Sequence, residues 1–407
     1  MARNNSDLLI KTTCDKIKSH VQPQQIKIDT PHRLKATNLF ACAGINQYYL
    51  QNIGVDVVLT NELVPDRAKL NHALFKNSTM VIGDITNPKV QDKLAEIANK
   101  EQPQILLASP CCQQITRANT RKDEDSDEQY LFEAVMEHLK RCPSYEFCAI
   151  ENAEDMLTFK TKKYELLLGD QIEKELRNLG FQYVCKAVQN AKHFGVAINR
   201  PRTIIMASKV KPIKLPEPIT EIPLTLEDAI DDLPTLEFGQ RGPDWYDEPG
   251  YVAPWQADQI RITPTGERVV SPLTLSKKVS GAKHAGAFSR ARWNEPMHSI
   301  LTNSGELSAY HMIHPGRLIV DDNGKPILDK DGNEQFTDCR TFTIHEIFRA
   351  IGLPDDIEIP YWARQKTKLL RTVLGECWVS AHCCAVVAEF VKAEFNPNTK
   401  TEGENHE

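Results

Sequence analysis

The stretch Ile105–Thr116, ILLASPCCQQIT, decides how the rest of the chain is interpreted. Its apolar start ends at Ser109 and Pro110, and two cysteines and two glutamines follow. A parallel strand that is buried on both faces produces such an apolar run, and functional groups collect just beyond the carboxyl ends of such strands. A thiol there is placed for nucleophilic attack on a substrate, although an inert core cysteine is the more common case. The neighbouring segments decide between these two interpretations.

Composition limits the class of protein. The 407 residues are 41% hydrophobic and 26% charged, which is typical of a soluble globular chain with one large domain or two. No apolar run approaches the roughly 18 residues of a membrane span, and the first twenty residues lack the apolar core of a secretory signal. Eleven cysteines without a CxxC pair predict reduced thiols in a cytoplasm and no thiolate zinc site. The net charge of −6 argues against a histone-like coating of nucleic acid but allows one local basic face.

An alternation of short β-rich runs with helical runs from Ala36 to about Ser208 predicts an α/β fold, with a mostly parallel sheet and helices on both faces. The predicted strands are Ala36–Phe40, Asp56–Thr60, Thr79–Ile82, Ile105–Ala108, Tyr145–Ile150, Tyr183–Gln189 and Arg202–Ala207. The predicted helices between them are Asn46–Asn52, Pro65–Leu74, Lys89–Asn99, Gln129–Arg141 and Tyr164–Leu179. Patterning returns at the end with Thr343–Ile351, Leu369–Leu374 and Ser380–Phe395.

Composition also divides the chain into parts. We expect an N-terminal arm (1–35), a sheet domain (36–209), an insert (210–295), a segment that completes the sheet domain (296–395) and a disordered tail (396–407). Within the insert, residues 211–259 carry a net charge of −8, whereas 260–292 carry +6. The second stretch also carries glycines and small residues and suits loops that approach a phosphate backbone, the alternative being a solvated loop. Its basic residues are Arg261, Arg268, Lys277, Lys278, Lys283, Arg290 and Arg292. Asp321–Gln335 has two turn signals and is predicted to be a surface hairpin.

Polar or small residues follow several of the predicted strands. After the first strand, Asn38–Gly44 (NLFACAG) is a small-residue turn that lets backbone amides approach a ligand. Glu62 ends the second strand, where a carboxylate can hold ribose hydroxyls, and Asp84 ends the third, where a carboxylate can meet an adenine amine. Each alone would be a polar residue that caps a strand. Together they favour a nucleoside pocket.

Two further groups stand at strand ends. Glu151 and Asn152 follow the fifth strand, where a carboxylate could bind or protonate a heteroaromatic ring; a helix cap is the alternative. Arg200 and Arg202 lie two residues apart at the start of a strand, so we expect both to point to one face. Two guanidinium groups would bind a phosphate or orient a carbonyl, unless they are a surface pair.

These motifs, taken in order, resemble a known family. NLFACAG, NEL, GDI, SPCCQ, IENAE, NRPR, RTFTIHEIFRAIGLPDD and LGECW have the order and approximate spacing of the DNA (cytosine-5)-methyltransferases, in particular the compact bacterial or phage enzymes. The resemblance covers about residues 36–395 and is weakest across 210–295, where the family carries a variable target-recognition domain. It implies a Rossmann-like class I S-adenosyl-L-methionine-dependent methyltransferase sheet with a smaller target-recognition domain.

The resemblance implies a role for each matching residue. Cys112 would be the nucleophile, with Cys111 in place of a usual second proline, although the other register would make Cys111 the nucleophile. Glu151 would engage the cytosine ring, Asn152 would hold its segment, and Arg200 and Arg202 would complete the catalytic set. The cofactor S-adenosyl-L-methionine would be bound by Phe40, Ala41, Cys42, Ala43, Gly44, Ile45, Glu62, Leu63, Asp84, Ile85, Cys111, Leu131 and Glu376. Some of these depart from the family pattern, since Cys42 and Ile45 replace usual glycines and Glu376 replaces a usual asparagine; Asn38, Ile198 and Trp378 are further departures.

The substrate is expected to be a cytosine flipped out of double-stranded DNA, because a base inside a duplex cannot be reached. Residues 113–128 have the polar composition of a mobile lid, and the expected DNA contacts there are Gln113, Arg117, Arg121 and Lys122, in addition to the seven basic residues of 260–292. We expect a cytoplasmic monomer that associates with the nucleoid and has no membrane partner. The resemblance also allows a cognate restriction endonuclease that is a separate protein.

Three alternatives remain open. An RNA methyltransferase of the same fold would act on a cytosine in transfer RNA, but the basic stretch 260–292 suits major-groove reading better. A cysteine hydrolase would need a histidine near Cys112, and His193 is the nearby candidate. A catalytically silent DNA-binding relative is disfavoured by the intact cysteine, glutamate and arginines.

Overall fold

The computed structural model describes residues 26–116, 123, 126–269, 289–300 and 313–395. The chain divides into two compact units. The sheet unit comprises Pro23–Phe194, Pro201–Ile219 and Cys377–Glu407, and the small unit is built from Gly195–Arg200 and Thr220–Glu376. We expected the chain to return to the sheet domain at residue 296, whereas the small unit continues to Glu376 and the return begins at Cys377.

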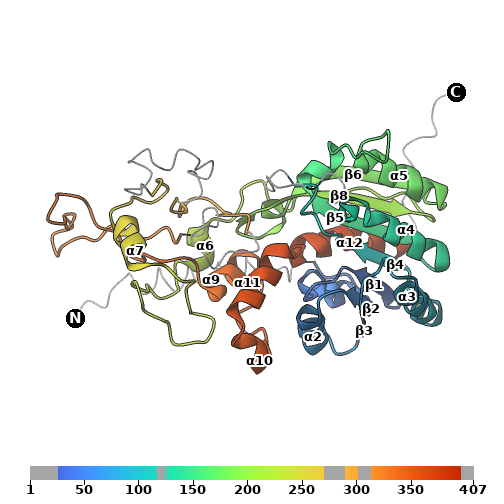
Figure 1. The fold of residues 1–407 in the computed structure, drawn as a ribbon, viewed down its shortest axis with the longest axis horizontal. Helices are drawn as coiled ribbons and strands as arrows, with labels where there is room; N and C mark the ends of the chain where they lie inside the picture. The colour runs from blue at the N-terminus through green and yellow to red at the C-terminus, as the bar shows by residue number, and fades with distance from the viewer. Residues whose placement is uncertain (1–25, 117–122, 124–125, 270–288, 301–312, 396–407) are drawn as a thin grey trace. The chain divides into compact units, whose positions relative to one another are not determined.

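The sheet unit contains a seven-stranded sheet in the order β3-β2-β1-β4-β5-β8-β6 (Figure 1). Its strands are β1 (Leu34–Leu39), β2 (Val55–Glu62), β3 (Thr79–Ile82), β4 (Ile105–Ala108), β5 (Phe147–Ala153), β6 (Tyr183–Asn190) and β8 (Pro201–Ser208). The pairs from β3 to β5 are parallel, and β8 runs antiparallel to both β5 and β6. The predicted α/β fold and mostly parallel sheet are confirmed.

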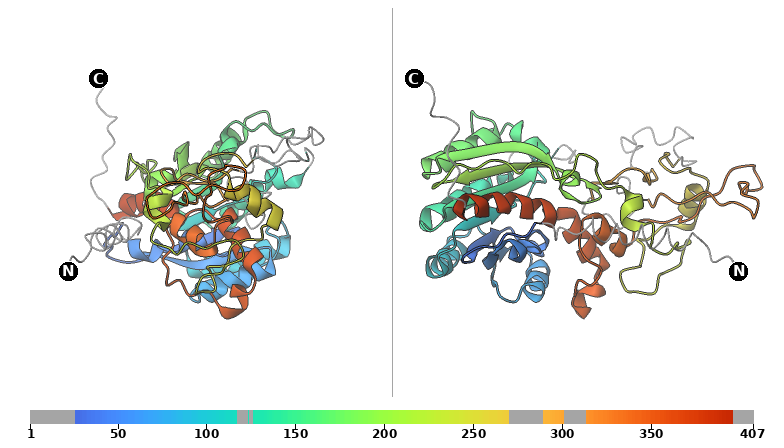
Figure 2. Two further views of the ribbon diagram at one scale, coloured as in Figure 1. Left: turned by 90° about the vertical axis from the view of Figure 1, so that its left-hand side faces the viewer. Right: turned by 180° about the vertical axis from the view of Figure 1, so that it is seen from behind.

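Helices cover both faces of this sheet, as Figures 1 and 2 show. One face packs against α3 (Pro88–Glu101), α4 (Phe132–Arg141) and α5 (Leu168–Asn178), and the other packs against α12 (Ser380–Phe395). On β4, Leu106 and Ala108 point into the first layer, whereas Ile105 and Leu107 point into the second. Each of these side chains is 0% exposed. The apolar run Ile105–Ala108 is therefore a central strand that is buried on both faces.

The predicted helix at Asn46–Asn52 is wrong. This segment forms two short 3-10 helices, η2 (Ile45–Gln47) and η3 (Leu50–Ile53). Left-handed glycines bound the segment at Gly44 (φ 75°) and Gly54 (φ 78°), as is common at the ends of helical segments. Its conformation is set by the buried Asn38, whose amide donates to Asn46 Oδ1 (2.9 Å) and Gln47 Oε1 (3.1 Å).

The other predicted helices of the sheet unit are present. Pro65–Leu74 forms α2, with Pro65 in the first turn where a missing N–H is tolerated. Asn87 accepts a hydrogen bond from Lys89 N (3.0 Å) and caps α3. Three further 3-10 helices lie in the connections between the described strands and helices: η4 (Asp127–Tyr130), η5 (Glu154–Leu157) and η6 (Ala191–Phe194).

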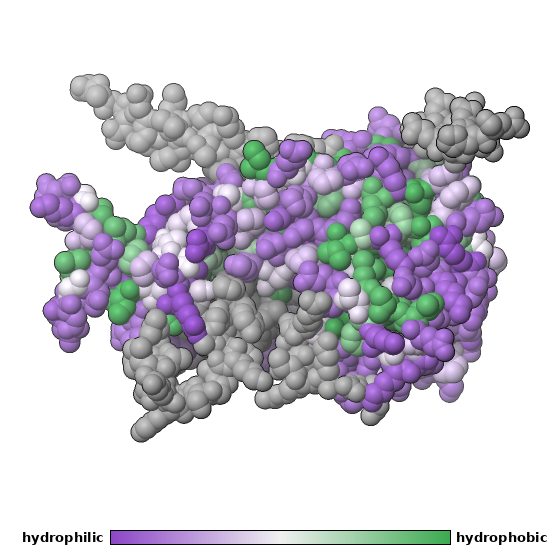
Figure 3. All heavy atoms as spheres, turned by 90° about the horizontal axis from the view of Figure 1, so that it is seen from above, coloured by the Kyte–Doolittle hydropathy of each residue, from purple (hydrophilic) through white to green (hydrophobic). Residues whose placement is uncertain are grey.

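The strand β6 lies at one edge of the sheet and is only partly covered along most of its length. Seen from above, apolar side chains gather on the sheet-unit surface (Figure 3). The exposed large apolar residues of this unit include Val188 on β6 and Leu166 and Leu167 just before α5. Among the described residues no single helix is long and apolar enough to span a membrane, although the helices Thr367–Glu376 and Ser380–Phe395 pass that test when taken together as a bent pair.

The small unit has little regular structure. Its helices are α6 (Leu226–Ile230), α7 (Pro254–Arg261), α9 (Ile344–Ala350), α10 (Tyr361–Arg364) and α11 (Thr367–Glu376), and β7 (Ile198–Asn199) pairs with β9 (Met297–His298). Charged side chains support its interior: Arg340 pairs with Asp338 (2.7 Å) and Glu346 (2.9 Å), and all three are almost fully buried. The predicted hairpin is present as a double turn held by bridges Val320–Pro326 and Leu328–Glu334.

Candidate active site

The sheet order places the ends of β1 and β4 side by side. Leu39 and Ala108, the last residues of these two strands, are register partners, and Ser109 N donates to Leu39 O (3.4 Å). The chain leaves β1 toward β2 on one side and β4 toward β5 on the other. This is the topological switch point of an open α/β sheet, where ligands bind. The turn after β1 and the segment Ser109–Cys112 therefore emerge at the same edge.

The turn after β1 has an unusual backbone. Phe40 (φ 54°), Cys42 (φ 48°) and Gly44 (φ 75°) all have the positive φ that non-glycine residues rarely adopt. Such conformations are costly and cluster at ligand sites. A glycine, which the family resemblance leads us to expect at the position of Cys42, would adopt this φ without strain. No sequence pattern indicates that Phe40 is also held in this way.

Glu62 holds this turn in place. Its side chain is 5% exposed, and its two carboxylate oxygens accept hydrogen bonds from Cys42 N (2.8 Å) and Val64 N (2.8 Å). On the other side of the turn, the amide of Asn71 on α2 donates to Cys42 O (3.2 Å). A carboxylate has about four acceptor positions, so these two bonds leave room for a ligand hydroxyl.

Asp84 lies in a more open place just after β3. It is exposed, and its Oδ1 accepts hydrogen bonds from Thr86 N (2.9 Å) and Thr86 Oγ1 (2.8 Å). Two large apolar side chains flank this region, Leu63 (60% exposed) and Ile82 (52% exposed). Apolar surface between two carboxylates fits a nucleoside, which has a flat apolar base and polar hydroxyl and amine groups.

Most of the remaining predicted cofactor residues belong to the sheet unit and are at least partly buried. Ala41, Ala43, Ile45 and Ile85 are buried, and Leu131 is half-buried at the start of α4. Gly44 has no space for a side chain, because an added Cβ would lie 2.8 Å from both Asn71 Nδ2 and Phe75 Cε2. The turn is therefore packed against α2 and not open to solvent at that point.

The segment that carries the two adjacent cysteines is anchored at both ends. The buried amide of Asn152 donates to Pro110 O (2.9 Å), and Cys112 O accepts hydrogen bonds from Ile115 N (3.0 Å) and Thr116 N (2.9 Å). The thiols of Cys111 and Cys112 are both half-buried. The bond from Asn152 thus ties the end of β5 to the segment that carries the two cysteines.

Glu151 is brought to the same edge by β5. Because β8 is antiparallel to β5, its beginning lies beside the carboxyl end of β5, with Arg202 the register partner of Ala153. Arg202 Nε lies 3.0 Å from Glu151 Oε1, and the side chains are only 17% and 6% exposed. An ion pair removed from solvent in this way fixes the carboxylate in one orientation.

Comparisons with known proteins agree with this geometry. Residues 34–379 match the family model for C-5 cytosine-specific DNA methylases. The type II methyltransferase M1.HgaI of Avibacterium volantium is 31% identical over 356 residues, which cover 84% of this chain and 93% of that protein.

This chain belongs to the C-5 cytosine-specific DNA methylase family.

Solved structures show the same fold. A prophage-encoded DNA modification methyltransferase from Escherichia coli superposes with a TM-score of 0.59 at 15% identity. The superposition covers 89% of this chain and 99% of the Escherichia coli chain. The Dnmt2 methyltransferase of Schizosaccharomyces pombe gives a TM-score of 0.54 at 16% identity, with 89% and 99% covered. The family model and the type II methyltransferase relative favour a DNA cytosine methyltransferase over the transfer RNA enzyme and the cysteine hydrolase.

Arg200 and Arg202 do not share one strand face, which corrects our expectation. The strand β8 begins at Pro201, between them, and Arg200 belongs to the small unit. There the Arg200 guanidinium is buried and donates to Gly375 O (2.8 Å) and Ile300 O (3.4 Å). Glu376, a predicted cofactor residue, also belongs to the small unit, as the half-buried last residue of α11.

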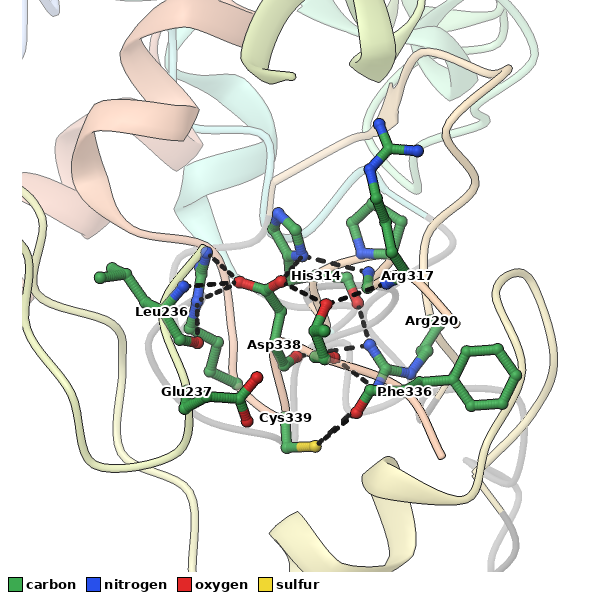
Figure 4. Close-up of polar contacts among 12 residues, drawn as sticks. Leu236, Glu237, Arg290, His314, Arg317, Phe336, Asp338 and Cys339 are labelled. Carbon is green, nitrogen blue, oxygen red and sulfur yellow. Dashed lines mark hydrogen bonds and ion pairs between the residues drawn. The ribbon is translucent and has the colours of Figure 1, made fainter. Parts of the chain in front are cut away.

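Arg290 cannot contact DNA as predicted, because it is 1% exposed in the interior of the small unit (Figure 4). Its guanidinium donates to backbone carbonyls of Ile260 (3.0 Å), His314 (2.9 Å) and Thr337 (3.0 Å). Burial lowers its pKa to about 10. The sequence could not distinguish this arginine from its neighbours, because all of them lie in one basic stretch.

The other predicted DNA contacts divide into two groups. Arg268, Arg292 and Gln113 are exposed, and Arg261 is half-buried and pairs with Glu237 (3.3 Å). Residues Arg117, Arg121, Lys122, Lys277, Lys278 and Lys283 lie outside the described residues.

His382 is a buried histidine close to Arg202 that was not among the predicted site residues. This histidine of α12 stacks on Phe194 with ring centroids 4.6 Å apart, and its Nε2 lies 3.1 Å from Gln189 Oε1. Burial, and then the charge of Arg202, lower its pKa to about 3, so the ring is neutral. Gln189 is in turn the register partner of Arg202 on β8. No motif in the sequence marks this histidine.

Proposed function

We propose that this methylase transfers a methyl group from S-adenosyl-L-methionine to carbon 5 of a cytosine flipped out of duplex DNA, through a transient bond with Cys112. The observation that carries the proposal is the juxtaposition at one sheet edge of a strained turn after β1, an anchored cysteine segment after β4 and a paired glutamate at the end of β5. These three groups are what binding a methyl donor and activating a pyrimidine require.

The side chains of Cys112 and Glu151 activate the cytosine ring. The thiolate of Cys112 adds to carbon 6 while Glu151 interacts with N3, and carbon 5 becomes nucleophilic. Arg202 keeps the Glu151 carboxylate in place through their 3.0 Å contact. When it is bound, the cofactor supplies an electrophilic methyl group. Loss of the carbon-5 proton and of the thiolate from carbon 6 then restores the ring and frees Cys112.

The cofactor site lies along the ends of β1, β2 and β3. Phe40 is proposed to stack on the adenine, Glu62 to accept the ribose hydroxyls and Asp84 to accept the adenine amine. The exposed apolar surface of Leu63 and Ile82 beside two carboxylates supports this assignment. Titration calorimetry with S-adenosyl-L-methionine tests it: Glu62→Ala and Asp84→Ala should each weaken binding by roughly tenfold or more, the loss expected for one hydrogen bond to a charged group. Unchanged affinities in both variants would contradict the site.

The small unit is proposed to read the target sequence. Its exposed Arg268 and Arg292 are suited to phosphate contacts, which position the protein without specifying sequence. A cognate endonuclease encoded as a separate protein, action in the cytoplasm at the nucleoid and a monomeric state complete the proposal. Bisulfite sequencing of DNA from cells that express the chain would report the target and the modified carbon together.

A mechanism-based trap tests the role of Cys112. With the methyl donor present, duplex DNA that carries 5-fluorocytosine at the target site should form a covalent complex stable to denaturation, because carbon 5 then has no proton to lose. Cys112→Ser should abolish this complex, whereas Cys111→Ser should still form it. Trapping by Cys112→Ser but not by Cys111→Ser would assign the nucleophile to Cys111. A transfer RNA with the same substitution is the competing substrate, and its preferential trapping would contradict DNA as the substrate.

A further inference from the structure

Most cysteines in the described part of the chain are unreactive because they are buried. Burial raises the pKa of Cys142 to about 11 and that of Cys148 and Cys384 to about 12, and Cys185 on β6 is likewise raised to about 11. At neutral pH these four thiols are protonated and are poor nucleophiles. The half-buried Cys111 and Cys112 are different, because they emerge from the end of β4 at the edge where the substrate is proposed to bind.

The two thiols are carried by adjacent residues of one anchored segment. Their backbone is fixed before Cys111 by the bond from Asn152 to Pro110 O and at Cys112 by the bonds from Ile115 N and Thr116 N. A second thiol therefore lies one residue away from any modified form of Cys112, so that no loop has to close to bring the two together. The proline that the family resemblance leads us to expect at position 111 would offer no such group.

We propose that Cys111 is a resolving thiol, which makes the Cys111–Cys112 pair a site of reversible modification by hydroperoxides. The proposal rests on the proposed function in one respect, namely that Cys112 is the reactive nucleophile. In the first step the Cys112 thiolate attacks the distal oxygen of the hydroperoxide, so that the O–O bond breaks, sulfur is oxidised to a sulfenic acid and an alkoxide or hydroxide leaves, which takes up the proton released by the Cys112 thiol. In the second step the Cys111 thiolate attacks the sulfenic sulfur, a disulfide forms and hydroxide leaves, which takes up the proton of the Cys111 thiol as water.

The product would be easy to reduce again. The Cα atoms of adjacent residues are about 3.8 Å apart across a trans peptide, which is shorter than the roughly 4.4–6.8 Å that disulfides usually span. A disulfide between neighbours is therefore strained, and strained disulfides have the more oxidising potentials of labile bonds. Methyl transfer should stop on oxidation, because the disulfide ties up the nucleophile, and should return on reduction. While the disulfide is present, Cys112 cannot be oxidised irreversibly to a sulfinic acid.

A single peptide reports this modification. Trypsin should release residues 101–117 (EQPQILLASPCCQQITR), which contain Cys111 and Cys112 and no other cysteine. After treatment of the full-length protein with tert-butyl hydroperoxide and blocking of free thiols, we expect this peptide to lack two hydrogen atoms and to carry no blocking group. Dithiothreitol should restore both thiols and the methyltransferase activity. A peptide that has gained oxygen atoms, or one joined to the Cys42 peptide, would overturn the proposal.

Cys111→Ser is the matched variant, and each protein is compared with its own reduced form. In this variant dimedone should label Cys112, and longer oxidation should cause a loss of activity that dithiothreitol does not reverse. Equal reversibility in the variant and the unaltered protein would contradict a resolving role for Cys111. The trapping experiment with 5-fluorocytosine uses reduced protein, so its outcome does not depend on disulfide formation. If trapping fails while the disulfide still forms and is reduced again, the catalytic role of Cys112 is refuted and the modification is not.

Discussion

The ion pair between Glu151 and Arg202 is the most sensitive contact of the site. Both side chains are largely removed from solvent, and their charged atoms are 3.0 Å apart. Removing one partner leaves the other charge buried and uncompensated, which typically costs about 3 kcal/mol or more. We therefore expect Arg202→Gln to lower the free energy of unfolding by about that amount and to reduce kcat by roughly a hundredfold, the effect of disturbing a positioned acid–base group. Urea unfolding and steady-state kinetics measure the two effects.

A double-mutant cycle shows whether the effect belongs to the pair. If Arg202 acts through Glu151, the Glu151→Gln and Arg202→Gln substitutions should be far from additive. The control is Glu154→Gln, because Glu154 is exposed three residues further along. If the loss in the double variant equals the sum of the losses in the two single variants, Arg202 has a role that is separate from Glu151.

Single residues of the site were predictable where strand ends placed them. Cys112, Glu151, Glu62 and Asp84 lie at or just beyond strand ends, and a parallel sheet brings such positions to one edge whatever the loops do. Contacts across the fold were not predictable. The bonds from Glu62 to the turn at Cys42 and the ring of His382 close to Arg202 depend on the packing of distant segments, which leave no local pattern.

At the scale of elements, α4 is joined to the sheet by a buried polar relay. His138 Nε2 lies 2.9 Å from Tyr145 Oη, and Tyr145 Oη donates to Thr37 Oγ1 (2.7 Å) on β1. The hydroxyl therefore accepts a hydrogen bond from His138, which requires a proton on Nε2 of the ring. Burial, with a smaller contribution from the charge of Arg141, lowers the pKa of His138 to about 4.

This relay predicts a dependence of stability on pH. Because the folded-state pKa is below the unfolded value of about 6.5, the unfolded chain binds a proton first as the pH falls. Stability should therefore be intact above pH 6.5 and should decrease by about 1.4 kcal/mol per pH unit between 6.5 and about 4 for this group alone. His138→Gln should reduce that slope in urea unfolding measured across this range. The exposed His72 on α2 supplies the control, and an equal change of slope in His72→Gln would contradict the assignment.

The turn after β1 provides a second prediction at this scale. Gly44 and Gly180 both have positive φ (75° and 89°), but only at Gly44 would an added Cβ meet other atoms, whereas Gly180 has nothing within 4 Å. Both alanine variants should lose about 1 kcal/mol or more from backbone strain. Gly44→Ala should lose a further 1–3 kcal/mol, roughly, from overpacking, and should also weaken binding of the methyl donor. Equal stability losses in urea unfolding would show that α2 does not confine the turn.

At the scale of the whole molecule, the sheet unit was largely predictable and the small unit was not. Alternating β and helical runs recur through 36–208, so the layers, strands and most helices of the sheet unit follow from periodicity. The small unit has short helices and long connections, and it is supported by buried charges such as Arg340 and Glu346 in place of a periodic apolar pattern. Its continuation to Glu376 was therefore hidden, because helices α9 and α11 resemble those of a sheet domain.

The buried Arg290 and the exposed Arg292 test whether the basic stretch has two separate roles. Arg290 donates to three or more carbonyls inside the small unit, so Arg290→Met should leave these acceptors unsatisfied and lower its stability by several kcal/mol, roughly 1–3 for each unsatisfied group. Arg292 is exposed, so Arg292→Met should leave the unfolding transition unchanged. It should instead weaken binding to duplex DNA and reduce the salt dependence of that binding by about one counterion.

Arg290→Met should therefore change the stability of the small unit, and Arg292→Met should change the affinity for DNA. Limited proteolysis should cut the small unit of Arg290→Met at a rate far above that of the unaltered protein, because local opening exposes its long connections. For Arg292→Met the cutting rate should stay the same while the DNA affinity falls at low salt and converges with that of the unaltered protein at high salt. A stable Arg290→Met protein with a reduced salt slope would place its guanidinium on a phosphate and contradict its burial.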